Sequence, residues 1–132
     1  MNEFDLLRTS AGMMSAQRSA LDVYARNVAT AQAQNADGGF TRLVPQIDLD
    51  DDGIVIFRGT KALSEPAIWV HDPNNPFAAA SGAHRGSVAH SSVDVLTEMV
   101  AAMDASRAYE TGASLFDTGK RLAERILDLE RQ

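Results

Sequence analysis

Residues 3–34 carry a repeating pattern of apolar positions that no proline interrupts. Apolar side chains at seven-residue intervals, with others three or four positions away, predict an amphipathic helix. The opposite faces of this segment are polar and include Arg8, Ser15 and Arg18. The apolar stripe consists of Leu7, Met14, Leu21 and Val28, with Tyr24 beside them. Such a stripe is typical of a helix that packs along a partner helix.

A second segment without proline, residues 93–129, has apolar positions in alternating steps of four and three. Small residues fill the first half of this row and large residues fill the second half. Because a glycine costs about 1 kcal/mol relative to alanine inside an isolated helix, the glycines here indicate close packing or a bend. The row consists of Ala101, Ala105, Ala108, Gly112, Leu115, Gly119, Leu122, Ile126 and Leu129, and a second row of Val93, Leu96, Val100 and Met103 widens it at the start.

The middle of the chain has a different pattern. Short β-type runs occupy residues 43–49 and 54–57, and 67–70 is a possible third run. The Asp-Gly pair that ends residues 50–53 favours a tight hairpin turn. Residues 71–92 are rich in proline, glycine, alanine and serine, which predicts an extended connector.

We therefore predict a mainly α protein with a small β insertion. The long N- and C-terminal helices are expected to pair as an antiparallel coiled-coil stem. The predicted parts are an N-terminal stem helix at 1–36, a β-rich insertion with a short β-hairpin at 37–70, an extended connector at 71–92 and a C-terminal stem helix at 93–132.

Both apolar stripes are wider than one helix contact can cover, so we expect self-assembly or a partner protein at their exposed remainder. Asn27 lies beside the first stripe. It is predicted either as a surface amide or as a buried amide that fixes the register of the packing. The residues predicted to form the helix seam and assembly surface are Leu7, Met14, Leu21, Tyr24, Asn27, Val28, Leu96, Val100, Met103, Ala108, Gly112, Leu115, Leu122, Ile126 and Leu129.

Composition narrows the possible partners. The chain has 12 basic and 18 acidic residues, a formal charge of −6 and no basic stripe, which argues against nucleic acid. Cysteine is absent, which excludes disulfides and thiolate metal sites. No apolar run approaches the roughly 20 residues that span a bilayer, so we expect no direct membrane insertion. The first residues lack the features of a cleaved signal peptide, so we expect the cytosol or export by a route without cleavage.

Three sequence patterns suggest a metal-binding, catalytic or phosphate-binding site, and each of them is incomplete. Residues 48–53 match the first half of a calcium loop, but its twelfth position is Gly59 and not a bidentate glutamate, which favours a solvated acidic turn. His71, His84 and His90 lack metal-ligand spacing. The serines lie in no nucleophile elbow, and the glycines form no phosphate-binding fingerprint. We therefore expect no enzyme activity and no cofactor, and we leave an ion role of the acidic turn open.

Segments in both predicted helices resemble signatures of the flagellar rod and hook axial proteins. The sequence AQRSALDVYARNVA at 16–29 is similar to their N-terminal signature. SVDVLTEMV at 92–100, followed by ASRAYE at 105–110, is similar to their C-terminal signature. DPNNPFA at 72–78, with GSV at 86–88, resembles the connector of the C type of proximal-rod protein in the flagellar basal body.

This resemblance implies a structural subunit that assembles helically with itself and with other rod and axial proteins. The assembly would be the drive shaft of the flagellar motor, which crosses the periplasm. It also implies export through the flagellar type III apparatus without signal cleavage. Two alternatives remain open, namely a helical adaptor or secretion chaperone that holds another protein's amphipathic helix, and a small calcium- or metal-binding module.

Overall fold

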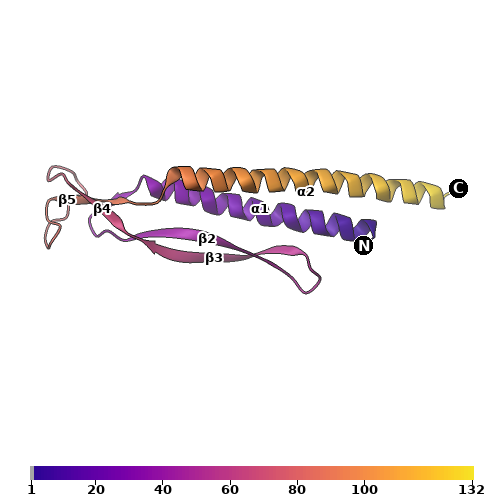
Figure 1. Cartoon of the computed structure of the whole chain (residues 1–132), viewed down its shortest axis with the longest axis horizontal. Helices are drawn as coiled ribbons and strands as arrows, with labels where there is room; N and C mark the ends of the chain where they lie inside the picture. The colour runs from indigo at the N-terminus through magenta and orange to yellow at the C-terminus, as the bar shows by residue number, and fades with distance from the viewer. Residues whose placement is uncertain (1) are drawn as a thin grey trace. The chain divides into compact units, whose positions relative to one another are not determined.

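The computed structural model describes residues 2–132. Along the chain the elements are α1 (Glu3–Ala31), β1 (Gln34–Asn35), β2 (Phe40–Leu49), β3 (Val55–Glu65), β4 (Ala67–His71), β5 (Ser87–Ser91) and α2 (Val95–Glu130) (Figure 1). The chain forms two compact units. The first unit comprises residues 2–22, 45–59 and 102–132, and the second comprises residues 23–44 and 60–101.

Both helices begin at a side-chain cap. The amide of Asp5 donates to Oδ1 of Asn2 at 2.8 Å, and the amide of Asn2 donates back to Oδ2 of Asp5 at 3.1 Å. At the start of α2, the amide of Leu96 donates to Oδ1 of Asp94 at 3.1 Å. These carboxylate and amide oxygens satisfy backbone N–H groups that the first helical turn leaves without a partner.

In the first unit α1 and α2 run antiparallel and touch through small residues. A Cβ added at Gly112 would lie 2.8 Å from Cγ of Met14, and one added at Gly119 would lie 3.3 Å from Cδ2 of Leu7. Large residues of the predicted row, such as Leu122 at 44% exposure, remain accessible. The predicted coiled-coil stem is therefore wrong. A coiled coil buries large side chains as knobs in holes, whereas glycine makes the close contacts here.

The second unit contains a three-stranded sheet in the order β1-β5-β4. Both pairings are antiparallel: Gln34 lies opposite His90 in one, and Trp69 lies opposite Ala89 in the other. The centre of this unit is closely packed, because Val88 and Ala89 of the middle strand are completely buried.

The predicted β-hairpin and extended connector also need correction. Strands β2 and β3 are 10 and 11 residues long and form their own two-stranded sheet, while β4 belongs to the other sheet. The stretch predicted as a connector contains β5, the central strand of that second sheet. About a quarter of the chain is strand, so the fold is two helices with two sheets and not a helical stem with a small insertion. The five residues of β5 become a strand because partners distant in sequence pair with it on both sides.

Candidate functional site

The predicted residues of α1 lie mostly in partly covered positions. Asn27 differs from the others, because its side chain is only 1% exposed. In the first unit Leu7 lies against Gly119 and Met14 lies against Gly112. The half-buried members of the set are Leu7, Met14, Leu21, Tyr24 and Val28.

The predicted residues of α2 divide by size. Gly112 is buried and Ala108 is half-buried. The large apolar residues are exposed by between 38% and 72% of their surface. They are Leu96, Val100, Met103, Leu115, Leu122, Ile126 and Leu129.

Four exposed residues near the start of α2 share one side of the helix. Their spacing of i, i+3, i+4 and i+7 places them next to one another on its surface. Glu98 and Ala105, which are 1% and 5% exposed, lie on the opposite side. We call this set the α2 apolar face: Leu96 at 72% exposure, Met99 at 51%, Val100 at 58% and Met103 at 56%. Leu96, Val100 and Met103 belong to the surface predicted from the sequence, and Met99 does not.

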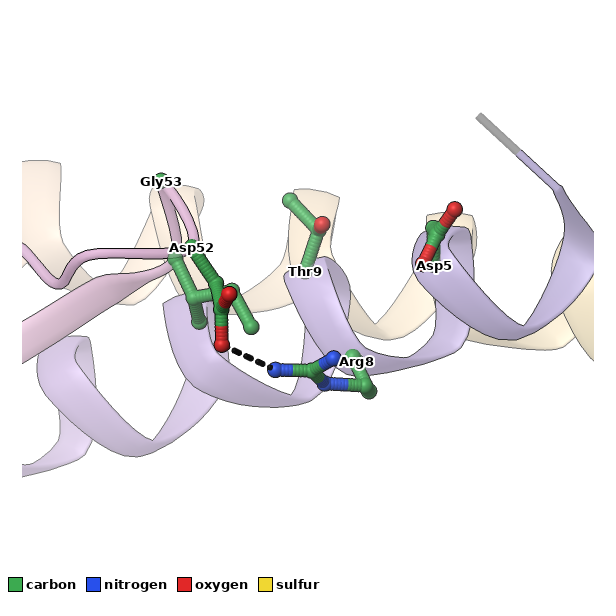
Figure 2. A pocket seen from close by; sticks show the side chains of 6 residues that line it. Asp5, Arg8, Thr9, Asp52 and Gly53 are labelled. Atoms are coloured by element: carbon green, nitrogen blue, oxygen red, sulfur yellow. Dashed lines mark hydrogen bonds and ion pairs between the residues drawn. The ribbon is translucent and has the colours of Figure 1, made fainter.

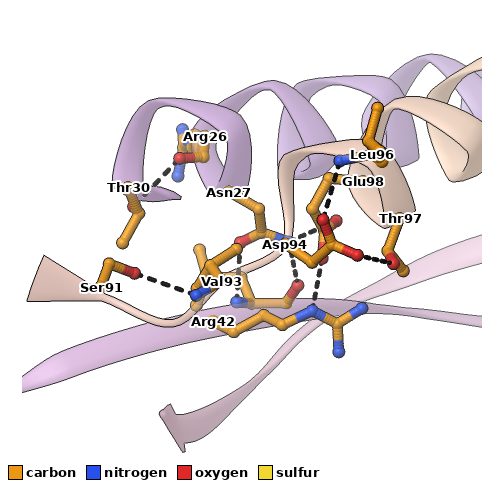
Figure 3. Close-up of polar contacts among 11 residues, drawn as sticks. Arg26, Asn27, Thr30, Arg42, Ser91, Val93, Asp94, Leu96, Thr97 and Glu98 are labelled. Atoms are coloured by element: carbon orange, nitrogen blue, oxygen red, sulfur yellow. Dashed lines mark hydrogen bonds and ion pairs between the residues drawn. The ribbon is translucent and has the colours of Figure 1, made fainter. Parts of the chain in front are cut away.

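A buried polar cluster joins α1, β2 and α2 in the second unit (Figure 3). Nδ2 of Asn27 donates to the carbonyl oxygen of Leu43 at 2.7 Å and to Oε2 of Glu98 at 3.0 Å. The amide of Leu43 donates to Oδ1 of Asn27 at 2.9 Å. Nε of Arg42 donates to Oε1 of Glu98, which completes an ion pair. Both carboxylate oxygens of Glu98 and both polar atoms of the Asn27 side chain therefore have a partner. Removing one member of the cluster would leave its partners without these hydrogen bonds.

Charge within the cluster is compensated. The hydrogen bond to Glu98 raises the pKa of Arg42 above its ordinary value, and partial burial acts in the opposite direction. Neither Arg42 nor Glu98 is among the site residues predicted from the sequence. A signal for Glu98 existed in the sequence, since Glu98 lies at seven-residue spacing from Ala105, Gly112 and Gly119 of the predicted row and is the only charged residue among the four.

The helix cap at Asp94 lies close to this cluster. Besides the Leu96 amide, its carboxylate accepts a hydrogen bond from the hydroxyl of Thr97 at 2.7 Å. The Thr97 hydroxyl and then the Leu96 amide lower the pKa of Asp94 below its ordinary value. The ionised form of Asp94 is therefore the form that caps α2.

Carboxylates of the acidic turn between β2 and β3 form hydrogen bonds and ion pairs with other groups of the protein. Oδ1 of Asp50 accepts hydrogen bonds from the amides of Asp52 and Ile54, both at 2.9 Å. Asp52 pairs with Nη2 of Arg8 on α1 at 3.0 Å, beside a surface pocket of the first unit (Figure 2). Asp48 pairs with Nε of Arg58 at 3.1 Å. Across residues 2–132, no group of three or more His, Asp or Glu side chains is arranged to hold a metal ion.

The three histidines lie in the second unit in different surroundings. The ring of His84 stacks on Trp69, with centroids 3.9 Å apart and planes 2° from parallel. The ring of His71 lies beside Gly86, and His90 belongs to β5.

Comparisons with known proteins identify flagellar relatives. A family model described as the C-terminal part of the flagellar basal body rod FlgEFG proteins matches residues 84–129. The flagellar basal-body rod protein FlgC of Aquifex aeolicus is 31% identical, with 97% of each chain covered. FlgC of Salmonella typhimurium is 30% identical over 98% of this chain and 96% of its own. FlgC of Borreliella burgdorferi is 27% identical over 92% and 93%. This chain belongs to the FlgC family of flagellar basal-body rod proteins.

Proposed function

We propose that the α2 apolar face is the surface through which this rod subunit binds its neighbours. As a member of the FlgC family, the chain is a structural subunit of the bacterial flagellar basal-body rod and assembles with other flagellar rod proteins. A subunit of such an assembly needs surfaces that stay uncovered in the single chain and become buried between chains.

The main support for this proposal is that α2 has small, tightly packed residues on one side and exposed apolar residues on another. One side holds Ala105, Gly112 and Gly119, which are buried within the chain. The other side is the α2 apolar face, whose four large side chains are more than half exposed. A helix with apolar residues on opposite sides is typical of a buried helix, so the second side needs cover from another molecule.

We also propose the partners of this subunit, its route of export and its purely structural role. Its partners are other copies of itself and the other axial proteins, and it reaches the rod through the flagellar export apparatus without a cleaved signal peptide. It has no enzymatic role, and it contacts neither nucleic acid nor the lipid interior in the assembled rod. Among residues 2–132, neither helix is long and apolar enough to cross a membrane. The adaptor or chaperone alternative is not favoured, because the similarity to rod proteins covers nearly the whole chain.

The test places a charge on the α2 apolar face. Val100→Asp and Met103→Asp should fold with helix content like that of the parent, because both positions are exposed. In the source bacterium with its own gene deleted, both variants should fail to restore swimming and should be absent from purified basal bodies. Thr111→Asp adds the same charge at an exposed polar position of α2 that lies more than two turns beyond Met103, and it should be incorporated normally. Incorporation of Val100→Asp at the parental level would refute the proposed surface.

A further inference from the structure

Strand β2 pairs with β3 on one side and is an edge strand on the other side within residues 2–132. An edge strand presents N–H and C=O groups that can pair with a strand of another molecule. Leu43 is one position where such groups point away from β3, since its N–H and its carbonyl both bond to α1. The partner in both bonds is the side chain of Asn27.

The contact between Asn27 and Leu43 reproduces strand pairing with a side chain. In an antiparallel sheet, two opposed residues of a hydrogen-bonded pair exchange two N–H···O bonds. The primary amide of Asn27 makes the same exchange, with bonds of 2.7 and 2.9 Å. Leu43 is only half-buried, so its N–H and carbonyl would be left without a partner at the edge of β2 if the Asn27 amide were absent.

We infer that Asn27 guards the free edge of β2 against the addition of a strand from another copy of this chain. Its amide occupies the positions that an incoming strand would use at Leu43. Glu98 fixes which way the amide faces, because it accepts from the same Nδ2 that donates to Leu43. Arg42 holds Glu98 in turn through the ion pair.

A second feature of the same strand points to the same role. Backbone groups along a strand alternate in direction, so residue 45 presents its groups to the same edge as residue 43. Residue 45 is Pro45, which has no N–H to offer to an added strand. Proline on an edge is a recurring protection against sheet extension. Two successive outward positions of β2 are therefore closed, one by Asn27 and one by proline.

The experiment compares three variants of the full chain. Asn27→Ala should increase the rate of thioflavin T-positive aggregation several-fold over the parent. Asn27→Ala combined with Leu43→Pro should return that rate to near the parental level, because proline removes the exposed N–H. Val23→Ala, in the buried part of α1 with Asn27 intact, controls for loss of stability. All rates are compared at temperatures where the folded fraction is equal.

Three outcomes would overturn the inference. The first is aggregation of the double variant at the rate of Asn27→Ala, and the second is an equal rate for Val23→Ala. The third is an Asn27→Ala chain that folds and stays monomeric. Should Asn27→Ala fail to fold, amide hydrogen exchange on the parent chain decides the question. The Leu43 N–H is expected to exchange at least tenfold more slowly than in an unstructured peptide. Unprotected exchange there would refute the inference that Asn27 blocks this position of β2.

Discussion

Asn27 and Glu98 lie 71 positions apart in the chain, and their side chains share a hydrogen bond of 3.0 Å at sites that are both 1% exposed. The contact links the end of α1 to the start of α2 within the second unit. Arg42 extends it to β2. A polar contact so deeply buried contributes to the fold only while every member is present.

Removal of Glu98 is therefore expected to be costly. Glu98→Ala leaves the Asn27 amide with one bond fewer and leaves Arg42 without its carboxylate, and breaking a buried pair in this way costs on the order of 3 kcal/mol. Glu98→Gln keeps one of the two acceptor oxygens but turns its NH2 group toward the other donor, so it should still lower the free energy of unfolding, by about 2 kcal/mol. Urea denaturation of both variants measures the difference. A Glu98→Ala chain as stable as the parent would mean that the cluster contributes nothing to stability.

The two glycines of α2 that face α1 should respond differently to alanine. A Cβ at Gly112 would lie 2.8 Å from Cγ of Met14, close to the start of that side chain, and 3.4 Å from the Ser10 carbonyl oxygen, so the Met14 side chain would have to shift. A Cβ at Gly119 would meet only the ends of two leucines, at 3.3 and 3.4 Å. We expect Gly112→Ala to lower the free energy of unfolding by about 1 kcal/mol through overpacking.

Gly119→Ala serves as the matched control for that change. Alanine favours the helix by about 1 kcal/mol over glycine, and the flexible ends of Leu6 and Leu7 can yield, so this variant should be neutral or stabilised. Chemical denaturation under identical conditions compares the two. The explanation by close packing fails if both substitutions stabilise the chain equally.

The cap of α2 predicts a dependence on pH. The pKa of Asp94 lies below its ordinary value near 3.8, mainly because the Thr97 hydroxyl donates to its carboxylate. The stabilisation is therefore fully present above that ordinary value and is lost as the pH falls through the lower folded pKa. Asp94→Asn retains a capping oxygen without this titration.

The corresponding measurement is Tm between about pH 5 and about pH 2. The parent should lose more of its Tm over this range than Asp94→Asn does. Asp104→Asn, which alters an exposed carboxylate further along α2, should follow the parent. If Tm fell equally with pH in the parent and in Asp94→Asn, the titration of Asp94 would make no contribution to stability.

The sequence predicted the two long helices because their periodicity is local and free of proline. It did not predict β1 and β5, which have 2 and 5 residues and become strands only by pairing across the fold. The prediction of a coiled coil was wrong for a related reason. Heptad spacing shows which residues share a side of a helix, but not that glycine would form the contact and leave Leu122 exposed.

The candidate site, like the fold, was predicted only in part from the sequence. Asn27 stood out because a polar residue lay beside an apolar stripe. The contacts of Asn27 with Leu43 and Glu98 could not be inferred, since these residues are 16 and 71 positions away and the contacts depend on how β2 and α2 fold onto α1. The role of Asn27 in fixing register remains a prediction, and the Glu98 variants above test the contact that it would depend on.

The turn between β2 and β3 contacts α1 in two ways, and the two should differ in strength. The ion pair of Arg8 and Asp52 is exposed on both sides, with 57% and 69% of the side chains accessible. Such pairs contribute little, so Arg8→Ala should change the free energy of unfolding by at most about 0.5 kcal/mol. The second contact is the close approach of Ile54 and Val55 to Gly12.

Gly12→Ala is expected to be the more damaging change. The added Cβ would lie 2.4 Å from Cγ2 of Ile54 and 3.0 Å from the carbonyl oxygen of Val55, so backbone and side chain would both have to move. The overpacking cost of about 1–3 kcal/mol exceeds the gain in helix propensity of about 1 kcal/mol, and the net effect should be a loss of stability. Urea denaturation of Gly12→Ala beside Arg8→Ala measures both effects. If Arg8→Ala proved the more destabilising, the ion pair and not the close packing would hold the turn against α1.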